Sequence, residues 1–249
     1  MNEPLRTRMI PETFVQLLHE YLDARGMASE HILGQARPVL HTHSLGSVPI
    51  ERWAKLLERA SRHLDDPLLG LHLGQTIAPR HLGVLGYLAM ACDNLGAALL
   101  RLEHYQRLIF DFVPMTQRIG PDYVDLVWDM TDCRPGALVD ENGITVLVQF
   151  CRSMTGVPES PLLVQFPNPS PSDIQPYLDW FGCPVQFAPE QNEIVVRVSF
   201  AVLMLPLKSA DPGLIAAMEH IADQLLAQLP KEDMVIELVR NTIVRLLYN

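Results

Sequence analysis

The sequence lacks the short motifs by which many catalytic and nucleotide-binding sites can be identified. It contains no GxSxG, no HExxH, no GxGxxG and no glycine-rich phosphate-binding loop. Each of these motifs places a nucleophile, a zinc ion or a phosphate in the geometry that its chemistry requires. An enzyme is therefore the least favoured of the functional classes considered below.

Positive charge is also scarce. The chain has 19 lysines and arginines against 29 aspartates and glutamates, which gives a formal net charge of −10. Phosphate contacts need clustered basic side chains. We therefore do not expect this chain to bind nucleic acid by itself.

The four cysteines are far apart and form no CxxC pair. No basic-then-apolar segment opens the chain, and no apolar run reaches the length of a membrane-spanning helix. We expect a cytoplasmic protein with reduced thiols and no membrane partner.

Histidines are the remaining candidate metal ligands. His41 and His43 can reach the same ion only from an extended segment, and no cysteine or carboxylate lies close in sequence to complete a site. We interpret them as surface or hydrogen-bonded side chains. The sequence thus predicts no metal and no cofactor.

Two pairs of neighbouring carboxylates, Asp65 with Asp66 and Asp140 with Glu141, could suggest acid–base catalysis. Adjacent residues of a helix point in different directions, so neither is expected to form a catalytic pair. We interpret the first pair as a helix end and the second as negative charge in the first turn of a helix, which the helix dipole favours. No catalytic residue is predicted.

Hydrophobic residues make up 48% of the chain, and their spacing changes along it. A period of 3.6 predicts helices and strict alternation predicts strands. We predict helices over residues 10–21, 50–64, 84–91, 95–109, 138–154 and 173–181. We predict strands over residues 113–119, 123–130, 162–166, 185–187 and 194–203. Because helices and strands are segregated, the predicted fold class is α+β, with helices packed on a mostly antiparallel β-sheet or half-barrel.

The last part of the chain returns to helix, with a short heptad seam. Its positions are spaced 3, 4, 3 and 4: Ile215, Met218, Ala222, Leu225 and Leu229. Pro230 ends this helix, and a final helix is predicted over residues 236–246. The seam has two interpretations, because it can pack on the domain's own core or pair with a second copy of the chain.

Four segments carry a resemblance to a known family: LGVLGYLAM (82–90), NLGAALLRLEHY (94–105), FGCPVQF (181–187) and MLPLKSADPGL (204–214). Together they resemble the N-terminal, arabinose-binding-like effector domain of bacterial AraC-type transcription regulators. The resemblance implies an effector domain over residues 1–210 and C-terminal dimerisation and linker helices over 211–249. It also implies a homodimer, which favours the seam as interface, and DNA contact only through a helix-turn-helix domain that we expect to be absent from this chain.

An alternative interpretation of residues 84–109 is a helix-turn-helix that itself contacts DNA. The second helix offers Arg101, His104 and Arg107, but its other face is committed to the core. The resemblance places this segment in the effector domain instead.

The resemblance also implies a small-molecule effector, since family members respond to fatty acids, amino acids or sugars. The candidate ligand-binding residues are polar or aromatic side chains beside apolar helices and strands: Arg80, His81, Tyr87, Trp128 and Arg152. An arginine beside an apolar cavity would suit a carboxylate, and an apolar ligand is equally compatible. The alternative function is a ligand-independent protein-interaction or dimerisation module.

Overall fold

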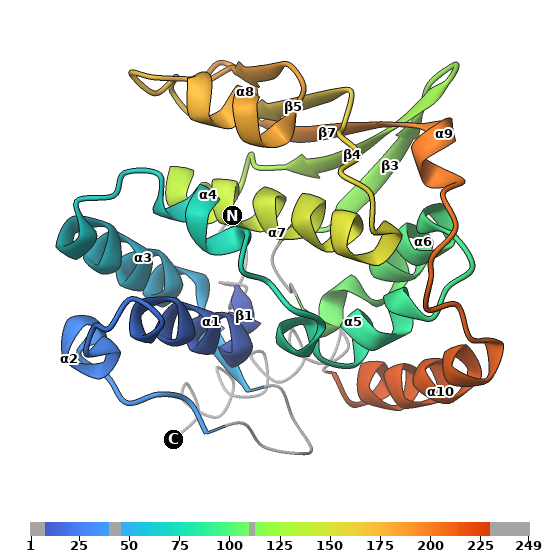
Figure 1. Ribbon diagram of the computed structural model, residues 1–249, viewed down its shortest axis with the longest axis horizontal. Helices are drawn as coiled ribbons and strands as arrows, with labels where there is room; N and C mark the ends of the chain where they lie inside the picture. Colours follow the sequence, from blue (N-terminus) through green and yellow to red (C-terminus); the bar gives the residue numbers. More distant parts are fainter. Residues whose placement is uncertain (1–7, 40–45, 110–112, 230–249) are drawn as a thin grey trace, which may run out of the picture.

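The computed structural model describes residues 8–39, 46–109 and 113–229. A β-sheet forms one layer, and the long helix α7 runs along one of its faces (Figure 1). The N-terminal helices lie on the side of α7 that faces away from the sheet (Figure 1). Helices α5, α6 and α10 lie together at the end of the molecule away from these N-terminal helices (Figure 1). The α+β class predicted from the sequence is confirmed.

Every helix predicted within the described residues is present, and three short helices, α2, α4 and α9, are additional. In the described part of the chain the helices are α1 (Glu12–Asp23), α2 (Ser29–Leu33), α3 (Ile50–Leu64), α4 (Leu69–Gly74), α5 (Gly83–Met90), α6 (Leu95–Tyr105), α7 (Ala137–Thr155), α8 (Gln175–Phe181), α9 (Phe200–Leu203) and α10 (Pro212–Gln228). Two short 3₁₀ segments, η1 (Pro79–Leu82) and η2 (Gln106–Leu108), precede α5 and follow α6. The predicted helix over 236–246 lies outside the described residues, as do His41 and His43.

The main sheet has five strands in the order β3-β4-β7-β5-β6. The strands are β3 (Met115–Ile119), β4 (Tyr123–Asp129), β5 (Leu163–Phe166), β6 (Val185–Phe187) and β7 (Glu193–Ser199). All neighbours are antiparallel except the parallel pair β5 and β6. A separate antiparallel pair joins β1 (Met9–Pro11) to β2 (Ser47–Pro49). The sheet is open, so the antiparallel prediction is confirmed without closure into a barrel.

The central strands present valines and leucines to α7 and polar residues to the opposite face. Leu126 pairs with Val196 on the covered face, whereas Arg197 lies opposite Asp125 on the other. The Arg197 guanidinium binds the Asp125 carboxylate through two hydrogen bonds of 2.7 and 2.9 Å. Val127 and Val195 lie on this second face and are nevertheless buried, with only 4% and 8% of their surfaces exposed.

The predicted strand over 194–203 is wrong in its last four residues. β7 ends at Ser199, and Phe200–Leu203 forms the short helix α9. The Ser199 side chain accepts a hydrogen bond from the Val202 amide at 3.2 Å, which caps the new helix. Residues 200–203 are all apolar, so the hydrophobic pattern alone could not locate the change from strand to helix.

Helix α4 packs closely against α7 through two glycines. A Cβ atom on Gly70 would lie 2.6 Å from the Leu138 carbonyl oxygen, and one on Gly74 would lie 2.6 Å from Thr145 Cβ. Any larger residue would therefore force the two helices apart. This approach holds α7 between the helical layer and the sheet.

The close packing buries the two carboxylates at the start of α7. Asp140 and Glu141 are 6% and 4% exposed, respectively. Asp140 accepts a hydrogen bond of 2.8 Å from the Asn168 amide, while Glu141 interacts with Tyr177. Burial raises the pKa of each carboxyl group to about 7. The two residues lie in the first turns of a helix as predicted, but inside the protein.

These raised pKa values predict that stability falls as the pH rises. The folded state holds protons on Asp140 and Glu141 that the unfolded state releases near pH 4 to 4.5, so their contribution is complete below that range and is lost as the pH rises through about 7. We expect Glu141→Gln to be more stable than wild type at pH 8 by roughly 1–3 kcal/mol, with a flatter dependence between pH 5 and 8. Urea unfolding followed by circular dichroism at four pH values measures this.

Glu190→Gln, which changes an exposed carboxylate, is the matched control and should leave the pH dependence of wild type unaltered. The prediction is wrong if Glu141→Gln and wild type show the same slope.

Candidate functional site

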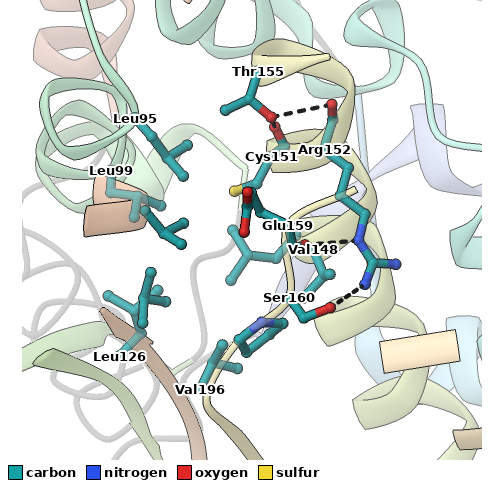
Figure 2. A pocket seen from close by; sticks show the side chains of 14 residues that line it. Leu95, Leu99, Leu126, Val148, Cys151, Arg152, Thr155, Glu159, Ser160 and Val196 are labelled. Atoms are coloured by element: carbon teal, nitrogen blue, oxygen red, sulfur yellow. Dashed lines mark hydrogen bonds between the residues drawn. The ribbon is translucent and has the colours of Figure 1, made fainter. Parts of the chain in front are cut away.

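A small apolar cavity lies between α7, α6 and the covered face of the sheet. Its volume is about 40 Å³. Leu95 and Leu99 approach it from α6, and Leu126 and Val196 from the sheet (Figure 2). Val148 and Cys151 of α7 close the opposite side.

Helical and strand periodicity together explain how these side chains converge. Residues four apart share a face of a helix, so Leu95 and Leu99 both point toward the sheet. Alternate residues share a face of a strand, which brings Val196 and Val198 of β7 beside Leu126. An unfilled volume of this size costs about 1 kcal/mol of stability, at ~24 cal/mol per Å³.

The thiol of Cys151 is part of this wall. Burial raises its pKa to about 12, so the thiol is neutral. A neutral buried thiol behaves as a small hydrophobic group. It therefore adds to the apolar character of the cavity and supplies no nucleophile.

Arg152 contacts the cavity only at its edge. Its guanidinium points away from the leucines of α6 (Figure 2) and donates to the carbonyl oxygens of Glu159, Trp180 and Phe181 at 3.0, 3.0 and 2.9 Å. It also lies over the Trp180 ring, 4.8 Å from the ring centre. Arg152 thus joins α7 to the end of α8 and to the segment after α7.

A second, open hollow lies on the other side of α9. This groove has a volume of about 470 Å³ and runs between α6, α9 and the β3–β4 hairpin. Phe200, Leu203 and Met204 form one wall, and Ala97 and Leu100 form another. Met204 and Leu100 are exposed over 69% and 59% of their surfaces. The groove is therefore apolar and accessible to solvent.

The other candidate ligand-binding residues lie elsewhere. Arg80 and His81 both contact the Glu20 carboxylate, at 2.7 and 3.1 Å, and tie η1 to α1. His81 is 1% exposed, and its Nδ1 accepts a hydrogen bond from the Ala78 amide, so Nε2 carries the proton toward Glu20. Burial alone would raise the pKa of Glu20, but hydrogen bonds from Gln16, Arg80 and His81 lower it to about 2. This network holds two helical segments together.

Tyr87 and Trp128 also lie away from both hollows. Tyr87 is on α5 and 47% exposed. Trp128 lies on the same sheet face as Leu126, where it packs against the core. Of the five predicted ligand-binding residues, the structure thus brings Arg152 alone to the cavity wall.

Sequence reasoning missed the apolar residues that form the two hollows. They carry no polar signal, and the same alternating pattern describes a filled core. The change from strand to helix at Phe200, which creates the wall between the hollows, was also missed.

The predicted seam on α10 largely packs against the chain's own domain. Ala222 is completely buried, while Ile215 and Met218 contact the core. At these three positions the contacts agree with the interpretation that the seam packs on the domain's own core. Leu225 and Leu229 remain half-buried.

Two polar contacts fix α10 to α6. Arg101 forms an ion pair of 2.8 Å with Glu219, and the Tyr105 hydroxyl donates to Asp223 at 2.7 Å. Burial, reinforced by the negative charge of Asp223, raises the pKa of Tyr105 to about 12. Arg101, one of the basic side chains of α6 considered for DNA contact, is thus directed to α10.

Within residues 8–39, 46–109 and 113–229, no group of three or more His, Cys, Asp or Glu side chains is arranged to hold a metal ion. None of the helices described is long and apolar enough to span a bilayer.

Residues 26–207 match the family described as the N-terminal arabinose-binding domain of AraC transcription regulators. The match covers most of the chain, which therefore belongs to this family. The resemblance inferred from the four sequence segments is confirmed.

Similar proteins are transcription regulators. The ornithine utilization regulator of Pseudomonas aeruginosa is 23% identical over 250 residues, which cover 98% of this chain and 73% of that protein. The crystal structure of the transcriptional regulator CdpR from the same species has a TM-score of 0.57 and 18% identity over 88% of this chain. At this identity the structural likeness shows a shared fold. The chain spans 62% of the CdpR chain, which is under two thirds of its length.

The contacts of Arg152 predict a role in stability. Arg152→Met keeps the aliphatic stem but leaves carbonyl oxygens without their donor, so we expect a loss of roughly 2–4 kcal/mol of unfolding free energy. Arg118→Met is the matched control, because Arg118 forms an exposed ion pair with Glu193 that should contribute at most about 1 kcal/mol. Chemical denaturation of both variants measures the difference. Equal losses would show that Arg152 does not anchor α8.

Proposed function

We propose that this chain is the ligand-sensing and dimerisation domain of an AraC-type transcription regulator, and that it is not an enzyme. The observation that carries the proposal is an apolar cavity and groove beside a helix that also contacts α10. Membership of the family supports the regulatory role. The free cysteines agree with a cytoplasmic location.

The geometry suggests how a ligand would act. A molecule that enters beside α6 would displace or stabilise Leu95 and Leu99 on one side of that helix. The other side carries Arg101 and Tyr105, which contact α10. A ligand that binds one position of α6 more tightly would therefore shift the population of α10 arrangements.

We propose that a homodimer forms through the exposed side of α10. Leu214 and Ile221 are seven residues apart and are 39% and 40% exposed. Ala217, between them, is also exposed, and Leu225 extends the stripe by one turn. This stripe lies beside the predicted seam and includes only Leu225 of its five residues.

The related regulators are longer than this chain. We propose that additional sequence of that kind makes the contact with DNA. The formal charge of −10 argues against a phosphate-binding role for the domain itself. A change in the spacing of two α10 helices would alter how two DNA-binding units reach their half-sites.

A protein-interaction module is the second candidate. Met204 and Leu100 expose much of their apolar surface at the groove, as side chains at an interface do. In this case a partner protein would occupy the groove, and small molecules would not bind.

Native mass spectrometry with a thermal-shift screen tests the sensing proposal. The screen should contain amino acids, sugars, fatty acids and neutral aliphatic compounds. We expect at least one class to raise the melting temperature saturably and to bind one molecule per chain. If no class binds, the interaction module is favoured.

The dimer proposal predicts different outcomes for two substitutions on α10. Ile221→Asp places a charge on the exposed stripe and should give a folded monomer. Met218→Asp buries a charge against the domain core and should lower stability by roughly 2–4 kcal/mol. Sedimentation equilibrium and thermal unfolding distinguish the two. A dimer that persists in folded Ile221→Asp would refute this interface.

A further inference from the structure

The inner cavity and the outer groove share two residues. Leu99 of α6 and Leu126 of β4 line both hollows. They are 3% and 1% exposed, so each lies in the core with a hollow on either side. The two side chains therefore form part of the boundary between the two spaces.

The short helix α9 completes this partition. Val202 lines the inner cavity, whereas Phe200 and Leu203 line the groove. α9 has one turn, and the chain after it is held to the start of α6 by a hydrogen bond of 3.1 Å from the Leu95 amide to the Leu205 carbonyl. A thin wall of apolar side chains therefore separates the small cavity from the larger and more open groove.

The charges around the two hollows disfavour an acidic ligand. Their linings contain no lysine, and the guanidinium of Arg152 donates to backbone carbonyls. At the groove, the Gln117 amide donates to the Glu103 carboxylate at 2.6 Å. Among the described residues that line the two hollows, a ligand carboxylate would thus find no free cation, and it would meet the negative charge of Glu103 beside Gln117.

We propose that the two hollows form one site for an elongated aliphatic molecule with an uncharged polar head. The apolar tail passes between Leu99 and Leu126 into the inner cavity, and the head remains in the groove near Gln117. This inference rests on the proposed sensing function and specifies its ligand class. Shape sets the elongated form, and the absence of a free cation sets the neutral head.

Straight-chain alcohols and carboxylates of equal length provide the test. Isothermal titration of the full chain with 1-hexanol, 1-octanol, 1-decanol and decanoate compares tail length and head charge directly. We expect affinity to increase with alcohol length and 1-decanol to bind at least tenfold more tightly than decanoate. Decanoate binding as tightly as 1-decanol would overturn the proposal.

A cavity-filling variant tests whether the tail enters the inner space. Val148→Ile adds one methyl group to a cavity of about 40 Å³, so it should retain the fold and reduce the gain in affinity from 1-octanol to 1-decanol. Cys151→Val fills the same cavity from the next turn of α7 and should act alike. An unchanged length preference in both folded variants would contradict entry into the cavity.

Groove variants test the position of the head and outer chain. Met204→Gln should weaken all the alcohols several-fold, whereas Ile119→Gln, at an exposed position outside the groove, should not. If amino acids or sugars bind and alcohols do not, the ligand class is wrong while sensing stands. If none of these compounds binds, the sensing function itself fails.

Discussion

The close packing of α4 on α7 is the constraint on which the rest of the structure depends. Gly70 and Gly74 allow the two helices to approach so closely that a Cβ at either position would overlap α7. α7 is thereby fixed on one side, and its other side, with Val148 and Cys151, faces the sheet. The same packing buries Asp140 and Glu141, so the position of α7 is obtained at the cost of two desolvated carboxyl groups.

Because α7 is held in place, the unfilled cavity between α7 and the sheet has a structural cause. Interiors are packed as densely as organic crystals, and neighbouring side chains normally collapse into a vacant space. Here Arg152 ties the end of α7 to three backbone carbonyls, so this end cannot easily settle onto the sheet. The cavity is therefore a property of the scaffold, and the proposed ligand tail would occupy it.

Most of the fold could be predicted from the sequence, because amphipathic periodicity is a strong local signal. The start of α6 carries a second local signal. The Asn94 side chain accepts a hydrogen bond from the Ala97 amide, as asparagine commonly does at the N-cap of a helix. Burial of Glu141 and the turn at Ser199 could not be predicted, because both depend on which distant segment packs against them. The candidate site was missed for the same reason: Leu99 and Val202 look like ordinary core residues until their neighbours leave space.

Polar residues were weaker guides than apolar ones. Arg80 and His81 bind the half-buried carboxylate of Glu20, so their positions beside an apolar helix are explained by a contact within the protein. A regulator whose effector is recognised by shape and not by charge has no polar motif for sequence analysis to find. Its function is then visible only in the arrangement of apolar side chains.

Helix α6 lies in one of the segments that resemble the family, and it also takes part in the proposed mechanism. Leu95 and Leu99 line the cavity from one side of the helix, while Arg101 and Tyr105 contact α10 from another. A helix of this length is rigid, so a displacement imposed by a ligand on one side must appear on the other. The polar contacts to Glu219 and Asp223 have specific geometry and respond to small shifts more sharply than apolar packing would. In the proposed mechanism, signal transmission would need no long pathway, because the proposed ligand site and the proposed dimer helix contact two sides of α6.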